Sequence, residues 1–353
     1  MINAEMYRMS KKKKNKKNGQ YYAKVFLTSF VAFLAILAGV RQILYRNKPQ
    51  QEVLTTPPPV TQHKIEPAAV PVEDVQEEIP TEAPKILPVL TENTQTIDDP
   101  YYDSKHSIVF GTDNYEIIAS KDAYSIMYPA SLTKIMTLIV AAENVADVKV
   151  KVNVREEVIE NLNAMNASVA GFYGGETPTL EDALYAMILS SGADAAIAIA
   201  EYVTGSEQGF VELMNQKATE MGLTDTHFAN VTGLHSSNHY STAADMAAIL
   251  AYAINNPFCR QVLSTSDYQT SSNDMRPDGM YISSTLSGHL AGQSMEGVNI
   301  IGGKTGFTDE AGYCLASFAE VNGKMFVQVY AGSESYFNAV DGSLHIYDAY
   351  CKQ

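Results

Sequence analysis

The hydrophobic positions of this chain divide it into three stretches of different character. Residues 21–40 (YYAKVFLTSFVAFLAILAGV) are almost continuously apolar, and about 20 such residues span the hydrocarbon core of a bilayer. Residues 47–100 are rich in proline, glutamate, threonine and valine, and they sustain no period of 2 or 3.6. From about residue 101 onward, alternating and 3.6-period segments follow one another, which is typical of a folded domain.

Strand-like patterns lie at both ends of this domain. Residues 107–110 and 116–119 flank Gly111-Thr112-Asp113-Asn114, and together they predict a hairpin. Asn322-Gly323, the strongest short hairpin signal, separates the last two strand-like stretches of the chain. The later stretches lie around Tyr268 and over residues 303–306, 313–320 and 324–332.

The middle of the domain, roughly residues 130–257, is predicted to be mainly helical. Pro129 opens an apolar helical pattern that reaches Val145, and proline at a helix start loses no hydrogen bond. Thr179, with Asp182 three residues later, begins another helix with a variant of the capping box. Further helices are expected over about 208–221, from Ser241-Thr242 to Asn255-Asn256-Pro257, and over about 339–350.

Strands at both ends with helices between them predict an α/β fold of the α+β type. We expect one central antiparallel sheet, completed by distant segments and flanked by helices, plus a mainly helical lobe. The chain is then divided into a basic cytoplasmic tip (1–20), a transmembrane anchor (21–46), a disordered Pro/Glu-rich linker (47–100) and a folded domain (101–353).

The charge distribution supports this division and excludes one class of partner. Eleven of the 25 Lys/Arg residues lie before residue 49, although the whole chain has a net charge of −15. Most of these bases precede the apolar run, so the positive-inside rule predicts a cytoplasmic N-terminus and an extracytoplasmic domain at the bacterial cell membrane. A cleaved signal peptide is the alternative, but Arg41 stands where small residues should mark the cleavage site. The acidic domain would repel phosphates, so nucleic acid is not expected as a partner.

The three cysteines predict no metal site. Cys259, Cys314 and Cys351 are widely spaced, form no ligand cluster and give no disulfide framework. One pair is possible, and at least one thiol stays free. We expect neither a metal nor a cofactor.

The segment Pro129-Ala130-Ser131-Leu132-Thr133-Lys134 has a serine and a lysine three residues apart at a helix start, so their side chains share a face. A serine hydroxyl needs a base to become a nucleophile, and a buried lysine with a lowered pKa can serve. Alone this is a weak signal, because Ser10 and Lys13 repeat the spacing in the basic tip. A helix cap with a solvated lysine is the simpler interpretation of the pair.

Two later segments strengthen the signal through their order. The helical pattern is broken at Ser190-Ser191-Gly192-Ala193-Asp194, and Gly303-Lys304-Thr305-Gly306-Phe307 lies on a predicted strand. Glycines in such a strand permit close backbone approach by a ligand. Lysine and threonine could hold a carboxylate.

Taken together, the three segments resemble the motifs of serine D-alanyl-D-alanine carboxypeptidases, the low-molecular-weight penicillin-binding proteins of the β-lactamase/transpeptidase-like superfamily. The stretch from Thr232-Gly233-Leu234-His235 to Met246 also resembles this family, and the resemblance covers roughly residues 105–350. The chain ends soon after the third motif, so the separate C-terminal domain of many such proteins is not expected.

The resemblance implies a mechanism acting on peptidoglycan stem peptides that end in D-Ala-D-Ala. Ser131 would attack the carbonyl of the penultimate D-Ala, with Lys134 as general base and Ser191 relaying a proton to the leaving D-Ala. Lys304 and Thr305 would bind the terminal carboxylate, and Lys304 would help to keep Lys134 neutral. The N–H groups of Ser131 and Phe307, which follows Gly306, would bind the oxyanion. β-Lactams would acylate the same serine as covalent inhibitors.

One position departs from the family pattern. The second motif usually reads Ser-x-Asn, but residue 193 is alanine, which can make no side-chain hydrogen bond. Asn163, Asn166 and Asn230 are near in the sequence, but nothing places one of them in the gap. A lost polar partner costs about 1–3 kcal/mol. A weakened enzyme, or a penicillin-binding pseudoenzyme, is therefore the alternative to a fully active carboxypeptidase.

Three other functions remain open. A class A β-lactamase needs a deacylating glutamate after the second motif, but Glu201, Glu207, Glu212 and Glu220 are interpreted as exposed helical residues. A zinc peptidase would need His239 and Asp245 as ligands, but no Glu-x-x-His completes the set and a loop and helix-face role is simpler. A wall-binding protein without catalysis would not need the serines and lysines of the motifs.

Overall fold

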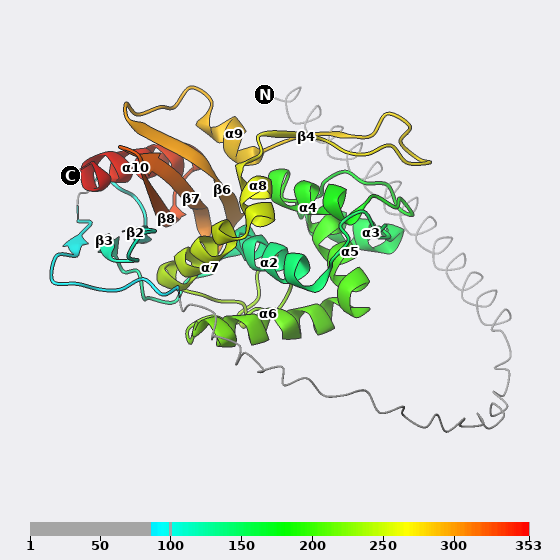
Figure 1. Cartoon of the computed structure of the whole chain (residues 1–353). Coiled ribbons are helices and arrows are strands. Elements are labelled where there is room, and N and C mark those ends of the chain that lie inside the picture. The colour runs from blue at the N-terminus through cyan, green and yellow to red at the C-terminus, as the bar shows by residue number, and fades with distance from the viewer. Residues whose placement is uncertain (1–85, 99–100, 353) are drawn as a thin grey trace, which may run out of the picture. The chain divides into compact units, whose positions relative to one another are not determined.

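The computed structural model describes residues 86–98 and 101–352, and these form a sheet with helices on both faces (Figure 1). The sheet has six strands in the order β1-β3-β2-β8-β7-β6. All neighbouring pairs are antiparallel except β1 with β3, which are parallel. The predicted antiparallel sheet is therefore confirmed, with one short parallel strand added at its edge. The strands are β1 Gln95–Thr96, β2 His106–Gly111, β3 Ile117–Lys121, β6 Val298–Thr308, β7 Gly312–Val321 and β8 Lys324–Ser333.

Both predicted hairpins are present. β2 and β3 pair around the turn after Gly111, and β7 and β8 pair around Asn322-Gly323. Asn322 and Gly323 have φ values of 51° and 76°, both left-handed, as a type I′ turn requires. Because this turn matches the twist of the strands, the local sequence alone defines the hairpin.

The segment between β3 and β6 forms the helical lobe. A 3₁₀ turn, η1, precedes the helix predicted from Pro129, and the capping box between Thr179 and Asp182 is present. The elements are η1 Ala130–Thr133, α2 Lys134–Asn144, α3 Glu156–Ala164, α4 Leu180–Leu189, α5 Ala193–Thr204, α6 Glu207–Met221, α7 Ala243–Asn255 and α8 Pro257–Ser264.

Three short elements after α7, namely α8, β5 and α9, were not predicted, whereas the strand-like stretch predicted around Tyr268 is present as β4. Asn256-Pro257 ends α7, but the Asn256 side chain also accepts hydrogen bonds from the N–H groups of Phe258 and Cys259, and so starts α8. The small sheet of β4 and β5 and the six-residue helix α9 follow. Their bounds are β4 Asp267–Gln269, β5 Tyr281–Ser283 and α9 Thr285–Leu290.

Two hydrophobic cores hold these layers together. The larger core lies between the helical lobe and one face of the sheet, and it includes Leu138 of α2, Ile249 of α7 and Val329 of β8. The smaller core lies on the opposite face under α10 (Tyr336–Cys351), with Tyr330 packed near Leu344. Alternate residues of β8 therefore point to different cores. Figure 1 shows α10 and the helical lobe on opposite sides of the sheet.

The predicted linker boundary at residue 100 is wrong. Ile86 and Ile97 are buried in the two cores, β1 pairs with β3, and the Val89 N–H donates to the Tyr115 carbonyl at 2.8 Å. The segment ILPVLTENTQTI is too short and too interrupted by proline and polar residues to show a period. The folded domain thus includes residues 86–98.

The predicted basic tip, the anchor over 21–46 and the linker up to residue 85 lie outside the described residues. Within the described part, no helix has the length and apolarity needed to cross a bilayer.

Candidate active site

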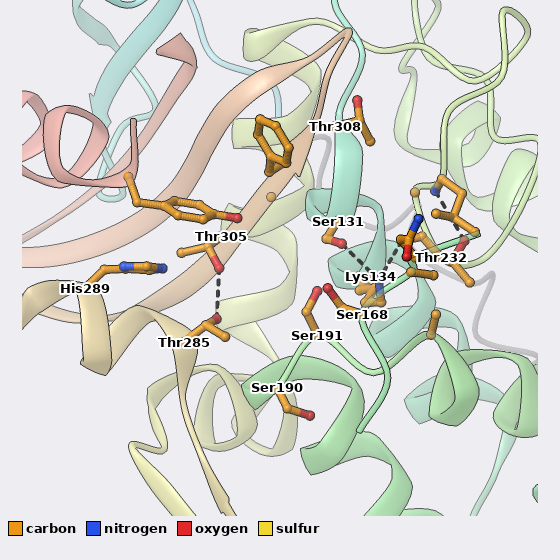
Figure 2. Close-up of a pocket in the computed structure, with 18 residues that line it drawn as sticks. Ser131, Lys134, Ser168, Ser190, Ser191, Thr232, Thr285, His289, Thr305 and Thr308 are labelled. Carbon is orange, nitrogen blue, oxygen red and sulfur yellow. Dashed lines mark hydrogen bonds between the residues drawn. The ribbon is translucent and has the colours of Figure 1, made fainter. Parts of the chain in front are cut away.

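Three segments that are far apart in the sequence meet at one cavity of about 380 Å³ (Figure 2). They are the η1–α2 junction, the turn between α4 and α5, and the end of β6. Six of the seven predicted site residues line this cavity: Ser131, Lys134, Ser191, Thr305, Gly306 and Phe307.

The Ser131–Lys134 pair has the geometry that acid–base activation requires. Lys134 Nζ donates to Ser131 Oγ at 3.0 Å and to the Thr232 carbonyl at 2.6 Å. Lys134 is only 2% exposed, and burial lowers the pKa of its ammonium to about 7, although the negative charge of Asp194 opposes this shift. A substantial fraction of the amine is therefore neutral near pH 7 and can accept the serine proton.

Two glycines allow η1 to pack closely against its neighbours. A Cβ on Gly306 would lie 3.0 Å from the Ser131 nitrogen, and one on Gly233 would lie 1.9 Å from the Ala130 carbonyl oxygen. The sequence prediction that the β6 glycines permit close approach by a ligand stays a prediction, and the structure shows a second use for them. They admit protein backbone, because Gly306 faces η1 and Gly303 faces the Ala316 carbonyl of β7. The backbone of Ser131 thus lies directly against the strand that carries Phe307.

A buried histidine, His239, is hydrogen-bonded to the same 3₁₀ turn, η1. The Ala229 N–H donates to Nδ1 of His239, so the proton of the neutral ring is on Nε2, which donates to Thr133 Oγ1 at 2.7 Å. Thr133 Oγ1 in turn donates to the Ala130 carbonyl. Burial lowers the pKa of His239 to about 4, which keeps the ring neutral.

These contacts argue against the zinc-peptidase alternative. Both ring nitrogens of His239 are hydrogen-bonded. Asp245 lies in the first turn of α7, and its carboxylate accepts a hydrogen bond from the Thr226 hydroxyl. Over residues 86–98 and 101–352, no three His, Cys, Asp or Glu side chains are grouped so that they could hold a metal ion. All three cysteines are buried free thiols.

The break in the helical pattern is the turn that presents Ser191. α4 ends at Leu189, Ser191 has a left-handed φ of 61°, and Gly192 caps α5. A left-handed conformation is costly for a serine and is often found where a side chain is aimed at a functional site. In Figure 2, Ser191 points toward Ser131 and Lys134.

Lys304 is the predicted site residue that does not line the cavity. Its side chain is 1% exposed, and its Nζ donates to the Thr305 carbonyl at 2.8 Å. Burial and the charge of Lys134 lower the pKa of Lys304. Burial is the main cause that lowers the pKa of Lys134, and the predicted help from Lys304 in keeping Lys134 neutral stays a prediction.

The wall formed by β6 includes residues that the sequence did not indicate. Thr285 Oγ1 lies 2.9 Å from Thr305 Oγ1, and His289 stacks on Tyr336 with a centroid distance of 4.1 Å. Phe307 is 42% exposed at the rim and stacks on Tyr313. Helix α9, which carries Thr285 and His289, has six residues, too few to show a 3.6-residue period. Its capping residue, Ser284, was the only sequence signal.

The opposite wall contains Ala193 and the loop before α4. Asn166 and Ser168 of this loop line the cavity together with Ala193. Asn230 does not fill the gap, because its side chain bonds to the Leu234 carbonyl and to the N–H groups of Thr232 and Gly233. Asn163 is exposed on α3 and does not line the cavity.

No glutamate is among the described residues that line the cavity. Glu201 lies on α5 paired with Arg155, and the other three glutamates considered for deacylation (Glu207, Glu212 and Glu220) lie on α6. This arrangement gives no support to a class A β-lactamase mechanism.

A serine bonded to a buried lysine at the junction of an antiparallel sheet and a helical lobe is the arrangement of the serine DD-peptidases, and comparison with known proteins agrees. Residues 93–335 match the family described as D-alanyl-D-alanine carboxypeptidase. The D-alanyl-D-alanine carboxypeptidase DacF of Bacillus subtilis (strain 168) is 30% identical over 234 residues, covering 66% of this chain and 58% of the relative. The D-alanyl-D-alanine carboxypeptidase DacC of Escherichia coli (strain K12) is 30% identical over 250 residues, covering 68% of this chain and 59% of the relative.

Solved structures show the same fold. The Streptomyces K15 DD-transpeptidase is 28% identical with a TM-score of 0.62, covering 69% of this chain and 96% of that one. Penicillin-binding protein 5 of Haemophilus influenzae is 27% identical with a TM-score of 0.62, and the match covers 71% of this chain and 72% of that one. The chain belongs to the D-alanyl-D-alanine carboxypeptidase family. It spans less than two thirds of the length of the B. subtilis and E. coli relatives.

Proposed function

We propose that this protein is a serine-type D-alanyl-D-alanine carboxypeptidase that removes the terminal D-Ala from peptidoglycan stem peptides during cell-wall maturation. The observation that carries the proposal is the 3.0 Å hydrogen bond between Ser131 Oγ and a buried lysine whose pKa is about 7. The names of the relatives support the substrate class.

The reaction follows from the arrangement of the side chains. Neutral Lys134 takes the proton of Ser131 Oγ as this oxygen bonds to the carbonyl carbon of the penultimate D-Ala. The N–H groups of Ser131 and Phe307 stabilise the oxyanion. When the tetrahedral intermediate collapses, the C–N bond breaks, and Ser191 passes the proton from Lys134 to the leaving nitrogen. Water then hydrolyses the ester and regenerates Ser131. A β-lactam would acylate Ser131 through opening of its amide ring.

The terminal carboxylate is proposed to bind at Thr305. Thr305 and Thr285 present adjacent hydroxyls at the cavity wall. Lys304 lies on the same strand and would assist if its ammonium exchanged the Thr305 carbonyl for the substrate carboxylate. An anion there would raise the pKa of Lys304 and restore its charge.

Labelled penicillin tests the nucleophile. We expect a covalent adduct that maps to Ser131, and D-Ala release from a stem pentapeptide. Ser131→Ala should abolish both, since it removes the hydroxyl that lies 3.0 Å from Lys134 Nζ. Ser10→Ala is the matched control, because Ser10 and Lys13 have the same spacing. An adduct at a different residue would refute the assignment.

A penicillin-binding pseudoenzyme is the second candidate, and Ala193 in the cavity wall is the observation that favours it. This protein would form the penicillin adduct but release no D-Ala from the pentapeptide. The two assays therefore separate the candidates.

We also propose that residues 21–46 anchor the domain on the outer side of the cytoplasmic membrane. The length of the apolar run and the bases before it support this proposal. Membrane fractionation of the protein with and without this segment tests it.

A further inference from the structure

The loop between α3 and α4 brings a hydroxyl to the cavity wall that contains Ala193. Ser168 and Ala193 both line the cavity, on the wall opposite β6. Figure 2 shows the Ser168 side chain beside Ser191 and Lys134. Ser168 is exposed, so a ligand in the cavity could reach its hydroxyl.

The second motif itself fixes the position of this loop. The Ala193 N–H donates to the Ser168 carbonyl at 2.8 Å, and the buried Asp194 carboxylate accepts from the Ala170 N–H at 2.7 Å. Gly192 allows the close approach, since a Cβ there would lie 2.6 Å from the Cβ of Ala170. Ser168 is therefore held next to residue 193 by contacts at its own carbonyl and at Ala170, as a binding residue requires.

The neighbouring serine offers a contrast. Ser190 also lines the cavity, but its hydroxyl donates to the Ala186 carbonyl at 2.8 Å, one turn back on α4. That hydroxyl has used its single donor within the helix. Within the part of the chain that the structure describes, no such bond to a helix carbonyl holds the Ser168 hydroxyl, and the backbone carbonyl of Ser168 anchors the loop.

We propose that Ser168 is a substrate-binding residue that takes the role left open by Ala193. Its hydroxyl hydrogen-bonds the backbone amide of the acyl part of the stem peptide while the peptide lies between the loop and β6. A hydroxyl both donates and accepts, so it can satisfy either group of a peptide bond. This inference rests on the proposed carboxypeptidase function.

Three variants test the inference: Ser168→Ala, Ser190→Ala and Ala193→Asn. We expect Ser168→Ala to lower kcat/KM for D-Ala release about tenfold, as loss of one hydrogen bond to substrate does. The rate constant for acylation by penicillin, which also carries a side-chain amide, should fall with it. Ser190→Ala should leave both unchanged. Thermal unfolding of each variant shows whether the fold is retained.

The double variant distinguishes binding from a structural role. Ala193→Asn should restore most of the activity of Ser168→Ala, but add little when Ser168 is present, because the two groups would serve one contact. If Ser168→Ala behaves like Ser190→Ala, or if Ala193→Asn raises activity equally in both backgrounds, Ser168 does not fill this role.

The failure of the proposed function gives a different result. If the unchanged protein is acylated but releases no D-Ala, the acylation constants of the same variants still decide the role of Ser168. If the unchanged protein shows neither acylation nor release, the carboxypeptidase proposal is refuted and this inference with it.

Discussion

Two lysines are buried at the active site: Lys134 lines the cavity, and Lys304 precedes Thr305 of its lining. Lys134 and Lys304 are both almost inaccessible, and each ammonium donates to a backbone carbonyl (Thr232 and Thr305). Burial lowers the pKa of Lys134, and the negative charge of Asp194 opposes this shift. The Asp194 carboxylate, however, accepts its hydrogen bonds from N–H groups of the loop and not from the ammonium. Burying a charge without a close counter-ion is costly, and the group responds by losing its proton. The same burial that destabilises the charged form makes Lys134 a usable base.

The pH dependence of acylation tests this explanation. With a pKa of about 7, Lys134 is protonated below this pH and cannot accept the serine proton. The rate constant for penicillin acylation should therefore fall about tenfold per pH unit below 7 and level off above it. We would measure it between pH 5.5 and 9.

A surface lysine provides the control for this measurement. Lys217 is paired with Glu143 and Glu220 away from the cavity, so Lys217→Arg should leave the profile unchanged. A midpoint above pH 9 would show that Lys134 has an ordinary pKa and is not the base.

At the scale of elements, Ser131, the proposed nucleophile, is positioned by backbone packing of η1 between two other segments. Gly233 lies against the Ala130 carbonyl, and Gly306 lies against the Ser131 nitrogen. Ala130 has a left-handed φ of 47°, which a non-glycine residue adopts only when its surroundings enforce it. The position of Ser131 therefore depends on contacts from segments about 100 and 175 residues later in the sequence.

Gly233→Ala should displace η1. The new Cβ would overlap the Ala130 carbonyl, so we expect penicillin acylation to fall at least tenfold. Gly205→Ala is matched in conformation, because both glycines have a φ of 81°, but a Cβ at position 205 meets nothing within 4 Å. This control should show only the cost of the left-handed conformation, about 1–2 kcal/mol in the free energy of unfolding, with acylation unchanged. Equal losses of acylation in both variants would contradict the packing argument.

The elements that the sequence predicted are those with local signals. The capping box at Thr179 and the hairpin at Asn322-Gly323 determine their own structure through neighbouring residues. The motif residues Ser131 and Ser191 were identified for the same reason, because their spacing is local or follows a family order. Ser168 and His289 were missed because only tertiary packing, against α5 and β6, brings them to the cavity. Burial of Lys304 could not be predicted either, since it depends on layers contributed by distant segments.

At the scale of the molecule, the described domain begins earlier in the chain than the hydrophobic pattern of the sequence predicts. Residues 86–98 complete the sheet at β3 and contribute to both cores. The sequence did not reveal this boundary, because the residues before it are rich in proline. A strand of two residues is too short to change the average composition of such a stretch.

Ile97→Ala measures the contribution of this segment. Ile97 is 1% exposed, so its truncation should lower the free energy of unfolding by about 2–5 kcal/mol in urea titrations. Val89→Ala, at a position that is 50% exposed in the same segment, should change it by no more than about 0.5 kcal/mol. Indistinguishable effects would mean that residues 86–98 behave as a linker in solution.

The placement of β1 and β6 at opposite edges of the sheet also bears on self-association. An unpaired edge strand can recruit any extended chain and is a hazard for aggregation. β1 has only two residues, so its edge presents few unpaired backbone N–H and C=O groups. On β6, a Cβ at Gly302 would lie 2.3 Å from the Leu263 carbonyl, so α8 packs against this part of the strand, while residues 305–308 border the cavity. The edge of β6 at residues 305–308 therefore lies where a short peptide can enter the cavity.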